Sequence, residues 1–104
     1  MPWVLLAVAG ILEILWAFAM KRSEGFTLLL PSVVTLAGMV ASFGLLAMAM
    51  RSLPLGTAYA VWTGIGAAGA FVVGVVFLGE ALVPMRVAAA GLIVAGIVLM
   101  KLAG

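Results

Sequence analysis

Glu13 is the residue best suited to chemistry, because it lies alone near the middle of an apolar run that covers residues 3–20. A charged side chain at the centre of a membrane span costs at least about 2.5 kcal/mol and is tolerated mainly beside a cavity or a partner. Apolar surroundings disfavour the carboxylate, so this group can hold a proton, release it and then attract a cation. We expect Glu13 to bind protons and a cationic substrate; the alternative is a protonated carboxyl that only hydrogen-bonds a neighbouring helix.

Small and aromatic residues surround this carboxyl group if the run is helical. Gly10 and Ala17 share the helical face of Glu13 and leave space beside it. Trp16 lies one turn along the chain, where its indole can donate a hydrogen bond to the carboxylate or present its π face to a cation. Packing against lipid is the other interpretation, although the middle of a span is an unusual place for an interfacial tryptophan. We therefore predict that Gly10 and Trp16 belong to the site.

The second and third apolar runs supply further polar and aromatic side chains. Tyr59 and Trp62 are three residues apart, so one helical face presents both to a pocket, although Tyr59 also suits a belt at the headgroups. Ser42 can donate a hydrogen bond into the same pocket, but a lone serine in a membrane helix often bonds its own i−4 carbonyl. The neighbours on these faces, which we expect to line the pocket, are Met39, Phe43 and Thr63.

The composition removes most other kinds of site. The chain has 104 residues, of which 68% are hydrophobic and 8% charged, whereas a soluble domain has about 25% charged residues. Asp, Asn, Gln, His and Cys are all absent, which excludes His/Cys metal sites, haem ligation, disulfides and Ser-His-Asp triads. We expect no metal, no cofactor and no enzymatic activity. The net charge of +2 is scattered, so no nucleic-acid partner is expected.

Four apolar runs fill the chain, and the sequence predicts one all-α domain over residues 1–104 that spans the lipid bilayer. The predicted helices cover residues 3–20, 28–50, 57–78 and 87–103. Each run is continuously apolar, which indicates helices, because the strands of a membrane barrel alternate and are about half as long. The connections are short, so consecutive helices are expected to be antiparallel.

The orientation of the bundle is poorly determined by its charges. If both termini lie on one side, that side carries Arg51 and Lys101, while the other side carries Lys21, Arg22 and Arg86. The positive-inside rule therefore gives almost no preference. Insertion in both orientations and a weak bias set by other features remain open at this point.

A second copy of the chain is the partner that the sequence favours. Four short helices can hardly enclose a water-lined path, so we expect at least two copies, which can be antiparallel if insertion is two-way. Gly91, Ala95 and Gly96 form a small-residue face on the fourth helix. Such a face suits either a contact between copies or packing within one copy.

Several stretches of this chain resemble one family of membrane proteins from end to end, the small multidrug resistance transporters. The stretches are GILEILWA (10–17), KRSEGFT (21–27), PS (31–32), ASF (41–43) and PLGTAYAVWTGIG (54–66). Trp16 and Lys101 are similar to the guanidinium-exporter subtype, whereas the multidrug subtype typically has a small residue near position 16.

The resemblance implies an antiparallel, dual-topology homodimer in the inner (plasma) membrane that works by alternating access. Proton and substrate would compete for the paired Glu13 side chains, and the residues that match the family's pocket are Trp16, Ser42, Tyr59 and Trp62. The stretch 91–96 matches the dimer contact of the family. Gly44 is a departure, because relatives often have an aromatic residue there, and it would widen one wall of the pocket.

These observations favour a proton-coupled antiporter that exports guanidinium and small substituted guanidinium ions. The nearest alternative is a broad exporter of quaternary ammonium and other lipophilic cations from the same family. Two further alternatives are one subunit of a heterodimeric pair and a structural membrane protein packed through its glycines, against which the buried charge of Glu13 argues.

Overall fold

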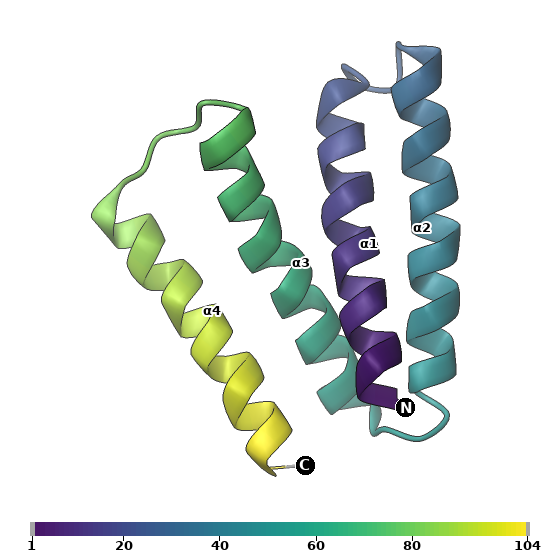
Figure 1. Cartoon of the computed structure of the whole chain (residues 1–104), viewed down its shortest axis with the longest axis vertical. Coiled ribbons are helices and arrows are strands. Elements are labelled where there is room, and N and C mark those ends of the chain that lie inside the picture. Colours follow the sequence, from purple (N-terminus) through teal and green to yellow (C-terminus); the bar gives the residue numbers. More distant parts are fainter. Residues whose placement is uncertain (1, 104) are drawn as a thin grey trace.

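Four long helices make up the part of the chain that the structure describes, residues 2–103 of a computed structural model (Figure 1). The helices are α1 (Pro2–Arg22), α2 (Leu29–Ala49), α3 (Leu55–Phe77) and α4 (Pro84–Ala103). Each has 20 to 23 residues and a mean hydropathy of 1.9 to 2.2, so each is long and apolar enough to cross a membrane. The prediction of an all-α chain with four helices that can span a membrane is confirmed.

The helix ends differ by a few residues from the ranges that the sequence predicts. Residues 84–86 were expected in a loop, but α4 begins at Pro84. The first turn of a helix has backbone N–H groups without helical partners, so a proline there loses no hydrogen bond. Pro54 precedes α3 with an extended backbone, and α3 begins at Leu55 rather than Thr57.

A tight turn joins α1 to α2. The Ser23 side chain is fully buried; its hydroxyl donates to the backbone oxygen of Met20 at 2.6 Å and accepts from the backbone N–H of Phe26 at 3.0 Å. Glu24 and Phe26 have positive φ angles of 51° and 67°, which are uncommon for residues with side chains. Both hydrogen bonds of Ser23 hold the turn closed, so that α2 returns directly alongside α1.

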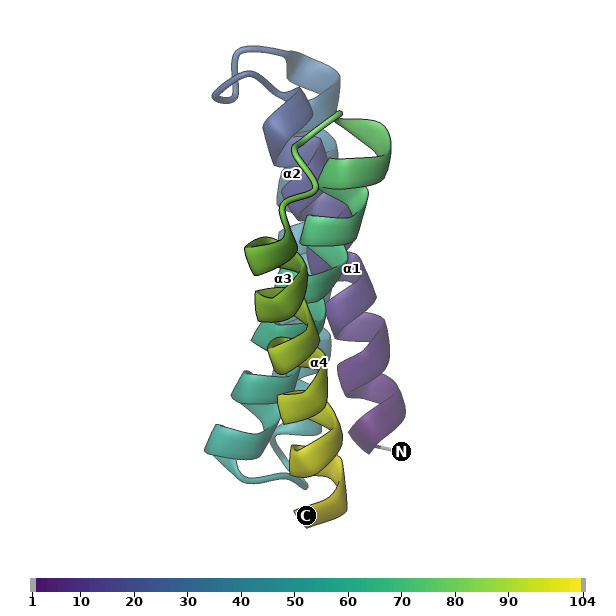
Figure 2. The ribbon, with the colours of Figure 1, turned by 90° about the vertical axis from the view of Figure 1, so that its left-hand side faces the viewer.

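The helices lie side by side in a thin layer of 40 × 34 × 16 Å (Figures 1 and 2). The order across the layer is α2, α1, α3, α4, and α1 packs against both α2 and α3. Both termini lie at one end, and the α1–α2 and α3–α4 connections lie at the other. α1 and α3 therefore run in the same direction, so steps along both helices lead toward the same end of the molecule.

The core is small and lies toward the end that holds the termini. It consists of buried residues from α1, α2 and α3, namely Leu6, Ala9, Leu46, Ala49, Ala58, Val61 and Trp62. The backbone of α4 lies next to that of α3 alone among the described helices, and α4 has no buried residue. The Lys101 ammonium of α4 lies 4.6 Å from the centre of the Trp3 ring of α1. The residues with candidate chemistry are thus placed by α1, α2 and α3.

Candidate functional site

Glu13 lies on the face of α1 that packs against α3, directly over Gly66. A Cβ atom at position 66 would lie only 2.8 Å from Cγ of Glu13 and closer still to its carboxyl group. Glycine at position 66 therefore allows the carboxyl to fit between the two helices. One carboxyl oxygen, Oε1, is buried and has no hydrogen-bond partner within residues 2–103. A buried acceptor without a donor costs about 1–3 kcal/mol, so this oxygen is ready to accept a proton or another donor.

Trp16 presents a second unsatisfied group on the same helix. Its backbone and side chain pack against Gly38 of α2, where a Cβ would come within 2.8 Å of the tryptophan Cβ. The indole Nε1 is buried and has no acceptor in the described chain. The hydrogen bond from Trp16 to Glu13 that the sequence allows is thus not formed. Glu13 and Trp16 leave one free acceptor and one free donor a single helical turn apart.

Ser42 connects three helices by two hydrogen bonds. Its buried hydroxyl donates to the backbone oxygen of Ala9 in α1 at 2.7 Å and accepts from Nε1 of Trp62 in α3 at 2.9 Å. The alternative of a bond to its own i−4 carbonyl is therefore wrong, because the hydroxyl crosses to the neighbouring helix. Neither of these hydrogen bonds involves Glu13. The Ser42 hydroxyl instead holds the indole of Trp62 in place.

Four aromatic rings from three helices form a continuous row. The ring centres of Trp16 and Phe43 are 6.2 Å apart, those of Phe43 and Trp62 are 5.5 Å apart, and those of Trp62 and Tyr59 are 5.6 Å apart. Phe43 and Tyr59 remain 44% and 52% exposed. The row therefore offers accessible aromatic surface, and an aromatic face attracts a cation.

The remaining predicted residues lie less directly at the carboxyl. Gly10 packs against Ile65, which occupies the space that the sequence left beside Glu13. The Thr63 hydroxyl donates to the backbone oxygen of Tyr59 within its own helix, and Thr63 lines a groove between α3 and α4. Met39 is half-buried on α2. The structure brings together Trp16, Phe43, Trp62 and Tyr59 as one row, with Ser42 bonded to Trp62. Glu13 lies one turn from Trp16 along α1 and contacts Gly66, which is one turn from Trp62 along α3.

Two residues outside the predicted site prove important for its geometry. Gly66 and Gly38 provide the surfaces on which Glu13 and Trp16 rest. The sequence signals that glycines gather in these helices, but it does not say which glycine meets which side chain. That pairing depends on the relative rotation and height of the helices, which local sequence does not determine.

A comparison with known protein families identifies the family to which this chain belongs. The family model described as Small Multidrug Resistance protein matches residues 1–93. The chain belongs to this family. The resemblance found in the motifs is confirmed, as is the prediction of a membrane protein with several spans. The four helices of this small multidrug resistance protein account for most of its chain.

Curated relatives in the family match this chain along nearly its full length. A protein named Guanidinium exporter from Escherichia coli (strain K12) is 56% identical over 102 residues, which cover 98% of this chain and 97% of the relative. The proteins of the same name from Citrobacter freundii and Salmonella typhimurium are 54% identical with the same coverage. These relatives are named as exporters rather than enzymes, in agreement with the expectation for this chain.

Proposed function

We propose that the protein is a proton-coupled antiporter that exports guanidinium and small substituted guanidinium ions across the inner membrane. One observation carries most of the argument: the buried Glu13 oxygen over Gly66 has no donor within the described chain. The names of the relatives, all guanidinium exporters, support the same choice of substrate.

The chemistry of the proposed substrate fits the groups around Glu13. Guanidinium is planar, stays charged at physiological pH and is weakly hydrated, and a carboxylate can accept two of its N–H groups in parallel. The row formed by Trp16, Phe43, Trp62 and Tyr59 offers faces for a flat cation. The hydrogen bonds from Trp62 to Ser42 and from Ser42 to Ala9 hold part of that row in place before the cation arrives.

Coupling to protons follows from the use of a single carboxyl group. A proton on Glu13 removes the charge that attracts the cation, and a bound cation blocks protonation of the same oxygens. If the site faces one side of the membrane at a time, each inward passage of a proton accompanies the export of a cation. Lowering the pH should therefore weaken guanidinium binding.

The functional unit in this proposal is an antiparallel homodimer, with the two Glu13 groups near the membrane midplane. The supporting observation is the open face of α4. A Cβ added at Gly91 or Gly96 would meet nothing within 4 Å, and Ala95 is exposed. Packing of α4 on α3 brings Ile97 against Gly64, and Gly96 borders the groove between these two helices. Gly91 and Ala95 are left available for a second copy.

Transport by the purified protein in lipid vesicles tests this function. With a pH-sensitive dye inside the vesicles, guanidinium uptake should make the interior more alkaline, because protons leave as the cation enters. We expect tetramethylammonium to move at least about tenfold more slowly, a difference of roughly 1.4 kcal/mol. Guanidinium uptake that leaves the internal pH unchanged would contradict the coupling.

A broad exporter of quaternary ammonium and lipophilic cations is the second candidate. Gly44 favours it, because a Cβ added there would meet nothing within 4 Å and Phe43 beside it is exposed. The surface of α2 beside Phe43 therefore has room for a bulkier cation. Equal transport of tetramethylammonium and guanidinium in the vesicle assay would select this candidate.

A further inference from the structure

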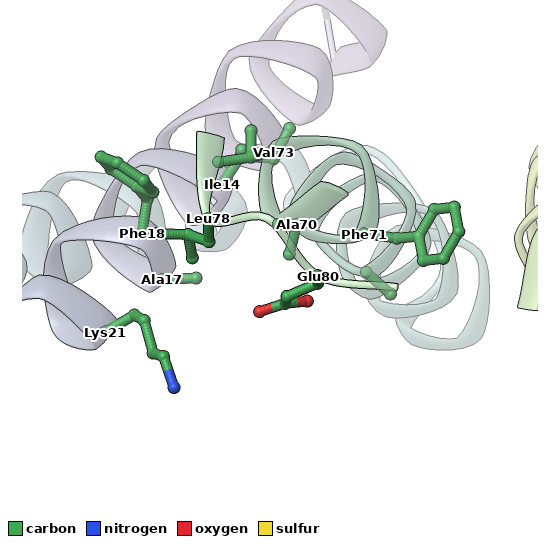
Figure 3. Close-up of a pocket in the computed structure, with 11 residues that line it drawn as sticks. Ile14, Ala17, Phe18, Lys21, Ala70, Phe71, Val73, Leu78 and Glu80 are labelled. Carbon is green, nitrogen blue, oxygen red and sulfur yellow. The ribbon is translucent and has the colours of Figure 1, made fainter. Parts of the chain in front are cut away.

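A cavity of about 310 Å³ lies between α1 and α3 (Figure 3). It is near the end of the molecule that carries the α1–α2 and α3–α4 connections. Its walls include the small residues Ala17, Ala67, Ala70 and Gly74. Lys21 contributes an ammonium group from α1, and Glu80 contributes a carboxylate from the segment that follows α3; in Figure 3 both lie at the open side of the cavity. The cavity thus has an apolar interior and a charged mouth.

The chain holds the Glu80 carboxylate at this mouth. Gly79 has a positive φ of 68° and turns the chain back on itself after α3. The backbone N–H of Glu80 then donates to the backbone oxygen of Gly74 at 3.1 Å. The carboxyl group lies on Gly74, where a Cβ would come within 2.8 Å of its carbon atom Cδ. Glu80 is exposed as a whole, but its side chain folds back onto α3.

The cavity continues the contact between Glu13 and Gly66 toward the membrane surface. Ala17 is four residues beyond Glu13 on α1, and Ala70 is four residues beyond Gly66 on α3. Because the two helices run in the same direction (Figure 1), both steps lead toward the mouth of the cavity, and both alanines line it. Lys21 and Gly74 lie four residues further on, which places the mouth about 12 Å from the buried carboxyl along the helix axis.

We infer that this cavity is an outer binding site for a guanidinium-type cation, in which Glu80 accepts the cation between the membrane surface and Glu13. The inference rests on the function proposed above. A carboxylate at the mouth attracts cations from water, and the small side chains below it leave space for a flat ion. The Lys21 ammonium on the opposite wall lies at the same mouth and repels an incoming cation, so it weakens the attraction that Glu80 supplies.

Substitution of Glu80 by Gln tests the charge while keeping the shape of the side chain and the backbone hydrogen bond to Gly74. In vesicles at low ionic strength, we expect Glu80→Gln to raise the KM for guanidinium about three- to tenfold and to leave kcat unchanged. Salt screens interactions between exposed charges, so the difference from the unmodified protein should shrink at high ionic strength. Glu24→Gln is the matched control: Glu24 is an exposed acid at the same end of the molecule but outside this cavity, and its loss should leave KM unchanged.

Two further variants leave the Glu80 carboxylate in the chain but change its position or its charged neighbour. Gly74→Ala keeps Glu80 but its new methyl group displaces the carboxyl group from its position against Gly74. The KM should therefore rise, as it does for Glu80→Gln. Lys21→Gln removes the positive charge that repels a cation at the mouth, so KM should fall. A merely structural role of Glu80 would predict neither the fall for Lys21→Gln nor the dependence on salt.

Equal KM values for Glu80→Gln, Glu24→Gln and the unmodified protein would overturn the inference while guanidinium transport itself continues. A rise in KM of the same size for both acidic variants would also overturn it, because the effect would then come from surface charge in general. If the unmodified protein transports no guanidinium at all, the proposed function fails instead, and the two failures are distinguishable in one assay.

Discussion

The contact between α1 and α3 and the outer face of α4 both depend on small residues, yet they are built in opposite ways. At Gly66 the missing side chain is replaced by the Glu13 carboxyl, and at Gly69 by Ile14, so the space is filled within one chain. At Gly91 and Gly96 a Cβ would meet nothing within 4 Å. The first set of glycines positions the Glu13 carboxyl group, whereas the second leaves open surface on α4, at Gly91 and along the groove that Gly96 shares with α3. Small-residue patterns alone do not distinguish these two purposes.

The largest effect is expected from Glu13→Gln, which removes the one acidic side chain in the predicted spans and keeps its shape. We expect complete loss of proton-coupled guanidinium transport and of cation binding, because an amide neither titrates nor attracts a cation. Insertion into the membrane should be unaffected. The measurement is uptake by the purified variant under a pH gradient, and retained uptake would refute the role given to Glu13.

The next largest effect concerns the open face of α4. Replacement of both Gly91 and Gly96 by leucine adds bulk to that face, where a Cβ at either position meets nothing within 4 Å. We expect the fold of the single chain to persist, but dimers and transport to be lost. Cross-linking in lipid, together with the vesicle assay, measures both. If the double variant remains dimeric and active, α4 is not the contact between copies.

Gly66→Ala should reduce transport by about tenfold or more, because its new methyl group takes the place of the Glu13 carboxyl. The carboxyl must then turn away or the two helices must separate. Gly56→Ala is the matched control on the same helix, since a Cβ there meets nothing within 4 Å. Comparable activity in the two variants would show that the contact of Glu13 with Gly66 does not matter for transport.

The sequence predicts the four helices and the importance of Glu13 because both depend on local composition: long apolar runs and a lone charge within one of them. The direction in which Ser42 donates could not be predicted, because its own i−4 carbonyl and the Ala9 carbonyl of another helix are equally plausible partners until the helices are placed. The same reason explains why Gly10 appeared to leave space that Ile65 in fact fills. Contacts between helices depend on their rotation and height, which a periodic pattern leaves open.

Ser42→Ala tests the connection among the three helices that surround the site. The variant leaves the indole N–H of Trp62 without its acceptor, a cost of about 1–3 kcal/mol for a buried group. We expect a lower thermal stability in detergent and a weaker guanidinium affinity, since Trp62 loses its fixed position. Ser32→Ala is a suitable control. The Ser32 hydroxyl donates to the backbone oxygen of Leu28 at the start of the same helix, and Ser32 is remote from the aromatic row. Equal losses in both variants would mean that Ser42 contributes to folding in general and not to the site.

The smallest effect, and the most specific, is expected from Trp16→Gly. Trp16 lies one turn from Glu13 and packs edge-on against Phe43, so its indole narrows the space through which a cation approaches the carboxyl. A flat guanidinium can lie against the ring while it bonds the carboxylate, whereas a tetrahedral ammonium with four substituents offers no N–H and no flat face. Removing the indole should admit bulkier cations and reduce the guanidinium preference over tetramethylammonium by about tenfold, roughly 1.4 kcal/mol. The measurement is the ratio of kcat/KM for the two ions in vesicles, and an unchanged ratio would place the source of selectivity elsewhere in the aromatic row.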